Sequence, residues 1–331
     1  MHPKFQSSMQ QKMKYFLYMS ACTALTLGGC SNDGNLMDHV SDSTSNVYMP
    51  QALQTPAVFT FNRDDTQTEL IYGACFGGPH ANNKDILVEF SPAPALVSSF
   101  NNQYFTNYPV MPAGSYELEQ SSATIPSGKV NTPPLKVRLH LDKLEGIGGY
   151  LLPVTIQSSN KLNDRLKTTY FLVKALYTSN PFPELDRSAW EVAGFSSEEP
   201  TGDGANNGKA IYAIDPSAST WWSTTWKASK PGPPHVLTID MHATQKLHGF
   251  SITGRLDAAG NFKTSGNPKS IIVETSTDGT TWSYSENFTL ENIKENTIYL
   301  SYAQEARYFR MTINTSQGDI YLTHIGDLKA F

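Results

Sequence analysis

The sequence predicts an all-β fold with two β-sandwich domains in tandem. The length of 331 residues leaves room for two domains of ordinary size, each able to bury its own core. Charged residues make up only 17% of a chain that is rich in Thr, Ser, Asn, Gly and Pro, a composition typical of turn-rich extracellular β-proteins. Short apolar runs between turn residues recur along the chain, and no long helical period interrupts them. The net charge of −5 is spread over interspersed charges, so nothing indicates a nucleic-acid partner.

Residues 1–30 have the organisation of a lipoprotein signal peptide. Lys12 and Lys14 form a basic region, and residues 15–27 form an apolar segment too short to span a bilayer. The sequence Leu-Gly-Gly-Cys that ends at Cys30 resembles a bacterial lipobox, whose cysteine is lipidated. Acyl chains on Cys30 would anchor the protein to a membrane without spanning it. The alternative is a plain secretory signal with a chance cysteine.

Residues 31–46 are rich in Ser, Asn and Asp and are expected to form a flexible tether. The run at 31–35 resembles the acidic tag that sends Bacteroidetes lipoproteins to the cell surface. We therefore expect an outer-membrane protein that faces the cell exterior and contacts the membrane only through its lipid anchor.

Residues 47–178 are predicted to form an immunoglobulin-like β-sandwich. Six segments have the apolar or alternating pattern of strands: 57–61, 68–72, 85–90, 137–141, 150–156 and 169–176. Pro153 places its strand at a sheet edge or at a bulge, and only residues 94–101 suggest a short helix. Residues 179–185 contain two prolines and are predicted to be a short, stiff linker.

Four motifs of this first domain resemble one family: Ala95–Asn101, Met111–Leu118, Ile125–Gly128 and Tyr150–Ile156. The family is the N-terminal sandwich module of Bacteroidetes surface lipoproteins, a domain of unknown function that also precedes endo-β-N-acetylglucosaminidases. The resemblance implies company with glycan-degrading enzymes and no chemistry of its own.

Residues 186–331 are organised around the segment 210–226, an ordered loop rather than a helix because Pro216 and its Ser/Thr neighbours disfavour one. Three tryptophans within six positions, Trp221, Trp222 and Trp226, suggest a loop that holds aromatic surface. Upstream, the oxygens of Asp215, Ser217 and Thr220 are spaced so that they can surround a hard cation such as calcium. The alternative is a capping turn followed by core tryptophans.

Alternating apolar residues further along predict a sandwich or jelly roll: Leu237, Ile239 and Met241, and then Phe309, Met311 and Ile313. Asp278-Gly279 is a hairpin signal, and Trp282 after it is predicted to be core.

The blocks Ala-Ile-Asp (213–215), Ser-Thr-x-Trp (219–222) and Ser-x-Asp-Gly-x-x-Trp (276–282) closely resemble the discoidin, or coagulation factor five/eight type C, domain. Its bacterial members include family 32 carbohydrate-binding modules, and it is a jelly roll. The resemblance implies a structural calcium ion with six ligand positions: Tyr212, Asp215, Ser217, Thr220, Gly326 and Asp327. Tyr212 and Gly326 would contribute backbone carbonyls. Ser217 stands where the family usually has Asn or Asp, and Asp327 stands where it usually has Glu.

The same resemblance implies a sugar site on loops at one end of the sandwich. Arg255 and Asn267 stand where the family's sugar-binding Arg and Asn usually lie, and Trp221 or Trp226 could be the aromatic platform. Trp222 matches the family's buried tryptophan, and Ser223 stands where many sugar binders carry His. Arg255 could instead be a structural salt-bridge partner.

These features predict a non-catalytic cell-surface lipoprotein that captures oligo- or polysaccharide for a polysaccharide-utilisation system, beside an outer-membrane glycan importer and glycan-degrading enzymes. The alternative is an adhesin or scaffold subunit, and a glycoside-hydrolase accessory with cryptic activity ranks third. The carboxylate clusters at 64–65, 184–186 and 198–199 suit solvated turns rather than a hydrolase pair. Burial or dispersal of Trp221, Trp226 and Arg255 would favour the scaffold.

Overall fold

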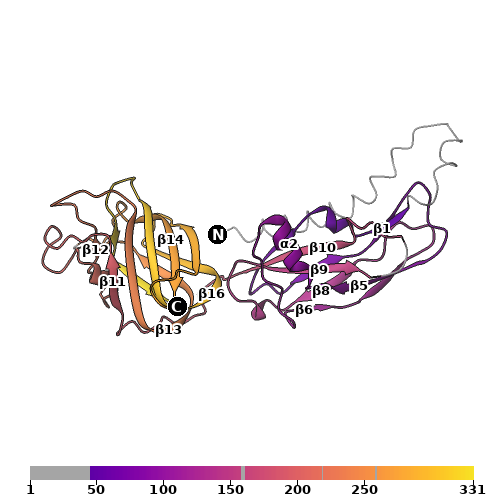
Figure 1. The fold of residues 1–331 in the computed structure, drawn as a ribbon, viewed down its shortest axis with the longest axis horizontal. Helices are drawn as coiled ribbons and strands as arrows, with labels where there is room; N and C mark the ends of the chain where they lie inside the picture. Colours follow the sequence, from indigo (N-terminus) through magenta and orange to yellow (C-terminus); the bar gives the residue numbers. More distant parts are fainter. Residues whose placement is uncertain (1–44, 158–160, 218, 258) are drawn as a thin grey trace. The chain divides into compact units, whose positions relative to one another are not determined.

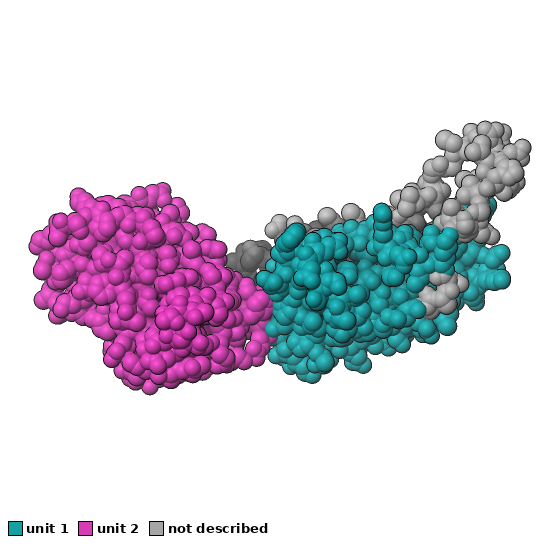
Figure 2. Space-filling model, viewed as in Figure 1, with its two compact units in different colours: residues 1–144, 149–176 teal, residues 145–148, 177–331 magenta. Residues whose placement is uncertain are grey.

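The structure, a computed structural model, describes residues 45–157, 161–217, 219–257 and 259–331. The predicted signal peptide, its Cys30 and most of the predicted tether lie outside the described residues. The chain forms two compact units (Figure 2): one extends to Leu144 and includes Gly149–Leu176, and the other comprises Glu145–Gly148 and Tyr177–Phe331. Among the residues described, no helix is long and apolar enough to cross a membrane.

The described part of the first unit is built from three sheets around one apolar core (Figure 1). A five-stranded sheet has the order β2 (Ala57–Asn62), β10 (Thr168–Leu176), β9 (Tyr150–Ile156), β5 (Ile86–Pro92) and β7 (Ser122–Ile125). A second sheet joins β3 (Glu69–Tyr72), β8 (Leu135–Leu139) and β6 (Tyr116–Leu118), and a third pairs β1 (Asn46–Tyr48) with β4 (Cys75–Gly77). Alternate residues of β5 and β8 are buried, as the two-residue period of a strand requires.

The six predicted strands of this unit are confirmed, and the predicted helix is α2 (Leu96–Tyr104). Val97 and Phe100 of α2 pack against Leu151 of β9 and Leu172 of β10. Short 3-10 helices are η4 (Pro50–Leu53) and η5 (Leu141–Lys143).

The prediction that Pro153 marks an edge strand or a bulge is wrong. Its strand β9 lies between β10 and β5. The Pro153 carbonyl accepts the Ala93 N–H at 2.9 Å, on the side where pairing with β5 ends at Val154. The backbone N and C=O of one strand residue point to the same side, so the Pro153 nitrogen also faces away from β10. Its missing N–H therefore interrupts no hydrogen bond between β9 and β10.

The second unit is a jelly roll in which two long strands carry most of the pairing. Its main sheet has the order β11 (Glu191–Phe195), β13 (His235–Thr253), β16 (Glu295–Ser316), β14 (Pro268–Ser276) and β15 (Tyr284–Thr289), and β18 (Asp327–Ala330) also pairs with β13. Pairing of β13 with β16 shifts register between Asp240 and Gln245 and again between Leu247 and Gly249. Bulges of this kind bend a strand, so each long strand serves both layers of the sandwich.

The predicted inward faces of the second unit are confirmed. Leu237, Ile239 and Phe309 are fully buried, and so is Trp222. Trp282 does not join this core: it is only half-buried, and the Arg310 guanidinium lies 4.1 Å from its ring centroid. The fold is therefore all-β with sandwich packing, as predicted.

The remaining short elements lie in the segments that carry the predicted site. They are η6 (Ala210–Ala213), β12 (Trp222–Ser223) and β17 (His324–Ile325), and β12 pairs with β17.

Candidate functional site

The loop around Trp221 is fixed by the strand that follows it. Trp222 is fully buried, and its indole N–H donates to the Ser197 carbonyl at 3.0 Å. Trp221, the residue before the strand, does not belong to the apolar core cluster that contains Trp222. The sequence assignment of Trp222 to the core rather than to the site is confirmed.

Three of the four predicted sugar-site residues come together around one carboxylate. The Arg255 guanidinium carbon lies 4.3 Å from the Trp221 ring centroid, a cation–π contact. Asp203 is 3.8 Å from an Arg255 Nη, and its other oxygen accepts the Trp226 indole N–H at 3.4 Å. The contacts thus run from Trp226 through Asp203 and Arg255 to Trp221. No sequence pattern pointed to Asp203.

Burial limits what these aromatics can offer to a ligand. Trp221 is only 8% exposed, and Trp226 is half-buried against Gly202. Trp221, Trp226 and Arg255 are therefore clustered, as a binding site requires, but Trp221 is not an open platform. Arg255 contacts a carboxylate, as its interpretation as a salt-bridge partner requires, and its role in sugar binding stays a prediction.

Asn267 supports the loop instead of facing solvent. Its side-chain oxygen accepts the Arg255 backbone N–H at 2.9 Å, and its amide nitrogen donates to the Lys263 carbonyl. The residue is 5% exposed. This corrects the sequence prediction that Asn267 contacts a sugar: it positions the backbone of Arg255.

Glu199 organises the loop that carries Trp226. Its carboxylate accepts backbone N–H groups of Thr201 and Gly202 at one oxygen and those of Trp226 and Lys227 at the other, at 2.8–3.2 Å. Burial raises its pKa, but these hydrogen bonds outweigh burial and lower the pKa to about 2. With 1% exposure, Glu199 is not the solvated turn residue that the sequence suggested.

Gly208 joins the Glu199 turn to the tryptophan segment. Its N–H donates to the Trp221 carbonyl at 2.8 Å, and its carbonyl accepts the Ser223 N–H at 3.2 Å. Its φ is +91°, and an added Cβ would lie 1.8 Å from the Glu199 carbonyl oxygen. Only glycine fits this position.

His324 is a further residue that the sequence did not indicate. It lies opposite Ser223 in the β12–β17 pair, and its Nδ1 is 2.7 Å from the Ser223 hydroxyl. Burial, assisted by the positive charge of Arg255, lowers its pKa to about 4, so the imidazole is neutral near pH 7. The only sequence signal was indirect, since Ser223 stands where sugar binders carry a histidine.

A hollow of about 510 Å³ opens beside Trp221. Its lining consists of Asn207, Ser219, Trp221, Leu256, Asp257, Ala259 and Gly260. Three buried polar atoms in this region have no hydrogen-bond partner among the described residues: Trp221 Nε1, Asn207 Oδ1 and Arg255 Nε. Buried polar atoms are nearly always paired, so this group has capacity for a polar ligand.

Comparison with known proteins identifies the second unit. The F5/8 type C domain model matches residues 193–325, and a model described as an N-terminal domain matches residues 42–163. Residues 193–325 are an F5/8 type C domain.

Individual relatives are similar to part of the chain. A sialidase of Micromonospora viridifaciens is 27% identical over 213 residues, which cover 63% of this chain and 27% of the sialidase. The chain thus spans about a quarter of the length of this curated relative. The C-terminal domain of a chitobiase from Bacteroides fragilis is 28% identical over 45% of this chain and 97% of its own, with a TM-score of 0.40. A family 32 CBM from C. perfringens NanJ, solved in complex with galactose, is 20% identical over 44% of this chain and 96% of its own, with a TM-score of 0.36.

The predicted metal ligands of the F5/8 type C domain divide into two groups. Thr220 Oγ1 lies 2.8 Å from both Asp215 carboxylate oxygens and from the Ser217 carbonyl oxygen. A hydroxyl has one hydrogen and can donate to only one of these three acceptors at a time. The surplus of oxygen lone pairs is the donor chemistry that a hard cation takes.

The distal predicted ligand has a different partner. Asp327 is 6% exposed and forms an ion pair with Arg187, whose Nη2 lies 3.3 Å from Asp327 Oδ2. Its strand β18 packs near η6, which contains Tyr212, while Gly326 donates its N–H to the Thr253 carbonyl at 2.8 Å. The Asp215 group fits a cation, whereas the charge of Asp327 is already balanced by Arg187.

Proposed function

We propose that the F5/8 type C domain binds a neutral glycan in the hollow beside Trp221. The observation that carries the proposal is that Trp221 Nε1 and Asn207 Oδ1, on two residues that line the hollow, have no hydrogen-bond partner among the described residues, and neither has Nε of Arg255, which lies over the Trp221 ring. Sugar hydroxyls both donate and accept, so one ligand can satisfy two donors and an acceptor together. The half-buried ring of Trp226 supplies apolar surface on the other side of Asp203.

The decisive variant is Trp221→Phe, which removes the indole N–H and keeps a ring in the cation–π contact. Glycan-array screening of the mature chain would identify a ligand, and calorimetry would measure its affinity. Loss of one hydrogen bond costs about 1 kcal/mol, so we expect affinity to fall by about fivefold. Trp282→Phe is the matched control, because Trp282 lies under Arg310 outside the site.

Failure of a folded protein to bind any glycan class would support the second candidate function, a scaffold that makes protein contacts. The burial of Trp221 is the observation in favour of that alternative. Binding that Trp221→Phe and Trp282→Phe weaken equally would also count against the hollow as the site.

We further propose that the Asp215 group holds a structural calcium ion, with Ser217, Thr220 and the carbonyls of Tyr212 and Gly326 as additional ligands. The ion would tie η6 to the loop that leads into Trp221. Calcium at 100 times its Kd would stabilise the domain by about 2.7 kcal/mol. The test is the unfolding temperature of chelator-treated protein with and without calcium. No response, or an equal response in Asp215→Asn, would rule the site out. The response should be unchanged in Asp327→Asn, because Asp327 pairs with Arg187 and is not among the proposed ligands.

A non-catalytic role is part of the proposal. Asp257, the one carboxylate lining the hollow among the residues described, has its pKa lowered chiefly by the Asn261 N–H. It is therefore ionised at neutral pH, and a glycosidase needs a protonated acid opposite a second carboxylate. Release of reducing ends from any bound glycan would contradict this.

Finally, we propose lipidation at Cys30 and display on the outer membrane, beside a glycan importer and glycan-degrading enzymes. The basis is the signal-peptide pattern of the sequence. Cys30→Ser should abolish incorporation of labelled fatty acid and release the protein from the membrane fraction. Protease accessibility of intact cells would test its orientation, and affinity capture through the anchored protein would test the partners.

A further inference from the structure

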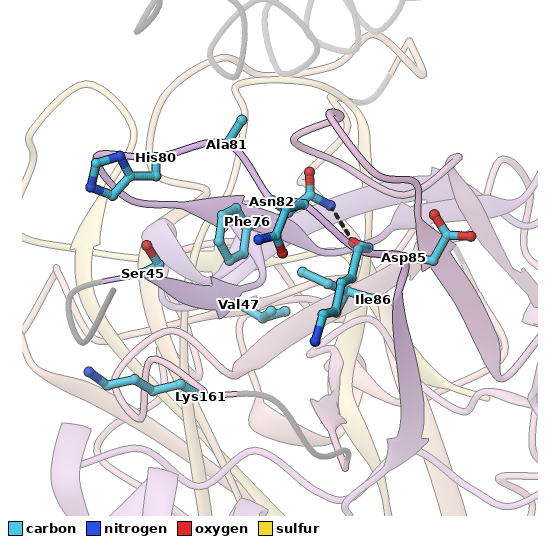
Figure 3. Close-up of a pocket in the computed structure, with 11 residues that line it drawn as sticks. Ser45, Val47, Phe76, His80, Ala81, Asn82, Asp85, Ile86 and Lys161 are labelled. Atoms are coloured by element: carbon cyan, nitrogen blue, oxygen red, sulfur yellow. Dashed lines mark hydrogen bonds between the residues drawn. The ribbon is translucent and has the colours of Figure 1, made fainter. Parts of the chain in front are cut away.

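The first unit contains a pocket of about 290 Å³ that no family resemblance assigns to a function. It forms where strand β1, the connection from β4 to β5 and the segment that begins at Lys161 converge (Figure 3). The Val47 N–H donates to the Lys161 carbonyl at 2.9 Å, and the Asn163 N–H donates to the Val47 carbonyl at 3.0 Å. Backbone bonds therefore fix where Lys161 stands at the rim.

The pocket combines an apolar floor with unpaired positive charge. Val47 and Ile86 are buried, and the half-buried Phe76 ring lies near both (Figure 3). Lys84 and Lys161 are exposed, and neither forms an ion pair with any of the described residues. Two ammonium groups against the single Asp85 carboxylate leave a local surplus of one positive charge in a chain of net charge −5.

The wall of the pocket is held in place and has an unused acceptor. Asn82 is 7% exposed, and its amide nitrogen donates to the carbonyls of Lys84 at 3.1 Å and Pro126 at 2.9 Å. Asp85 accepts the Ser127 N–H at 2.8 Å, which ties the same connection to the same turn. Asn82 Oδ1 is buried without a hydrogen-bond partner among the described residues. A wall fixed in this way costs little to order when a ligand binds.

We propose that this pocket binds one carboxylated monosaccharide unit of an acidic glycan. The carboxylate would pair with an ammonium group at the rim, that of Lys84 or Lys161, the C–H face of the ring would pack on Phe76, and a hydroxyl would donate to Asn82 Oδ1. Its volume is near the lower end of ligand pockets, roughly 300 Å³, which suits a single ring. The choice of a saccharide rests on the proposed glycan-binding function, whereas the requirement for negative charge rests on the two lysines alone.

The test compares ligands that differ only in the carboxylate. Methyl β-glucuronide and methyl β-glucoside are titrated against the mature chain by calorimetry or ligand-observed NMR, with inorganic sulfate as the charge-only probe. We expect the glucuronide to bind at least tenfold more tightly than the glucoside, and less tightly as salt is added. The variant Lys84→Met/Lys161→Met should lose at least tenfold in glucuronide affinity. Lys143→Met/Lys294→Met makes the same charge change at exposed lysines outside the pocket and should bind as the parent does.

Two further comparisons separate this site from the hollow of the second unit. Glucuronide binding that falls in the lysine variant and persists in Trp221→Phe places the ligand in the first unit. The proposal is overturned if the glucoside binds as well as the glucuronide, if the lysine variant binds normally, or if no binding occurs at millimolar concentration. Sulfate binding as tightly as the glucuronide would also overturn it, since the pocket would then recognise only charge.

Discussion

Replacing Glu199 by glutamine should destabilise the second unit selectively. The carboxylate accepts four backbone N–H groups, two at each oxygen, and one of them belongs to Trp226. A glutamine side chain keeps one acceptor and turns an NH₂ group toward the other two donors. Two buried N–H groups then lose their partner, which is the costly way to break a hydrogen bond.

The magnitude follows from the ionisation of this carboxyl. Folding lowers the pKa of Glu199 from 4.5 to about 2, which corresponds to at most about 3 kcal/mol at neutral pH. Loop relaxation and solvent screening reduce this, so we expect a loss of about 2 kcal/mol. Because the folded pKa is depressed, this contribution is complete above pH 4.5 and is lost as the pH falls toward 2.

Tryptophan fluorescence isolates the unit concerned, because all five tryptophans of the chain lie in the second unit. For a domain of this size, about 2 kcal/mol lowers the unfolding temperature by roughly 4–8 °C. Glu305→Gln is the control, since Glu305 is exposed on β16. An unfolding temperature of Glu199→Gln within 1 °C of the parent at pH 7, or an unchanged dependence on acid pH, would refute the reasoning.

Three other outcomes follow from the same loops. Gly208→Ala should cost about 3 kcal/mol or more, because it combines a positive φ with a Cβ 1.8 Å from a carbonyl oxygen; stability equal to the parent in chemical denaturation would contradict this. Asp203→Asn should weaken glycan binding by about fivefold with little change in unfolding temperature, because the anion that holds Arg255 and Trp226 is lost; an unchanged Kd would show that the two contacts are incidental. The pKa of His324 is lowered to about 4, so the unfolded chain takes up the proton first and the second unit loses stability as the pH falls from 6.5 toward 4. His324→Gln should flatten that part of the profile of stability against pH. A profile identical to that of the parent would exclude His324 as the source of the loss.

The fold was predictable because its signals are local. The alternation of Leu237, Ile239 and Met241 predicts a buried strand face, and the Asp278-Gly279 signal predicts a hairpin. Both predictions hold without knowledge of the residues that pair with these segments. The two errors have non-local causes. Pro153 tolerates an interior strand because pairing on its N–H side ends beside it, and Trp282 stays outside the core because Arg310 from a neighbouring strand covers it.

The candidate site was predictable only for the residues that carry family motifs. Trp221, Trp226 and Arg255 lie together in the structure, but Asn267 serves the backbone. Asp203, Asn207 and Glu199 fall in a loop whose sequence gives no periodicity, so nothing in the chain distinguished a buried carboxylate from a solvated one. Their roles depend on which N–H groups the folded loop turns toward them.

The arrangement of these carboxylates limits the chemistry open to the second unit. Glu199 is saturated by backbone donors, Asp203 joins Arg255 to Trp226, and Asp327 pairs with Arg187. Each of these negative charges holds a loop or a cation in place. Among the described residues of these loops, the buried polar atoms without a hydrogen-bond partner are Trp221 Nε1, Asn207 Oδ1 and Arg255 Nε. Binding there would complete hydrogen bonds at these atoms, so affinity should depend on how many of them one glycan can reach.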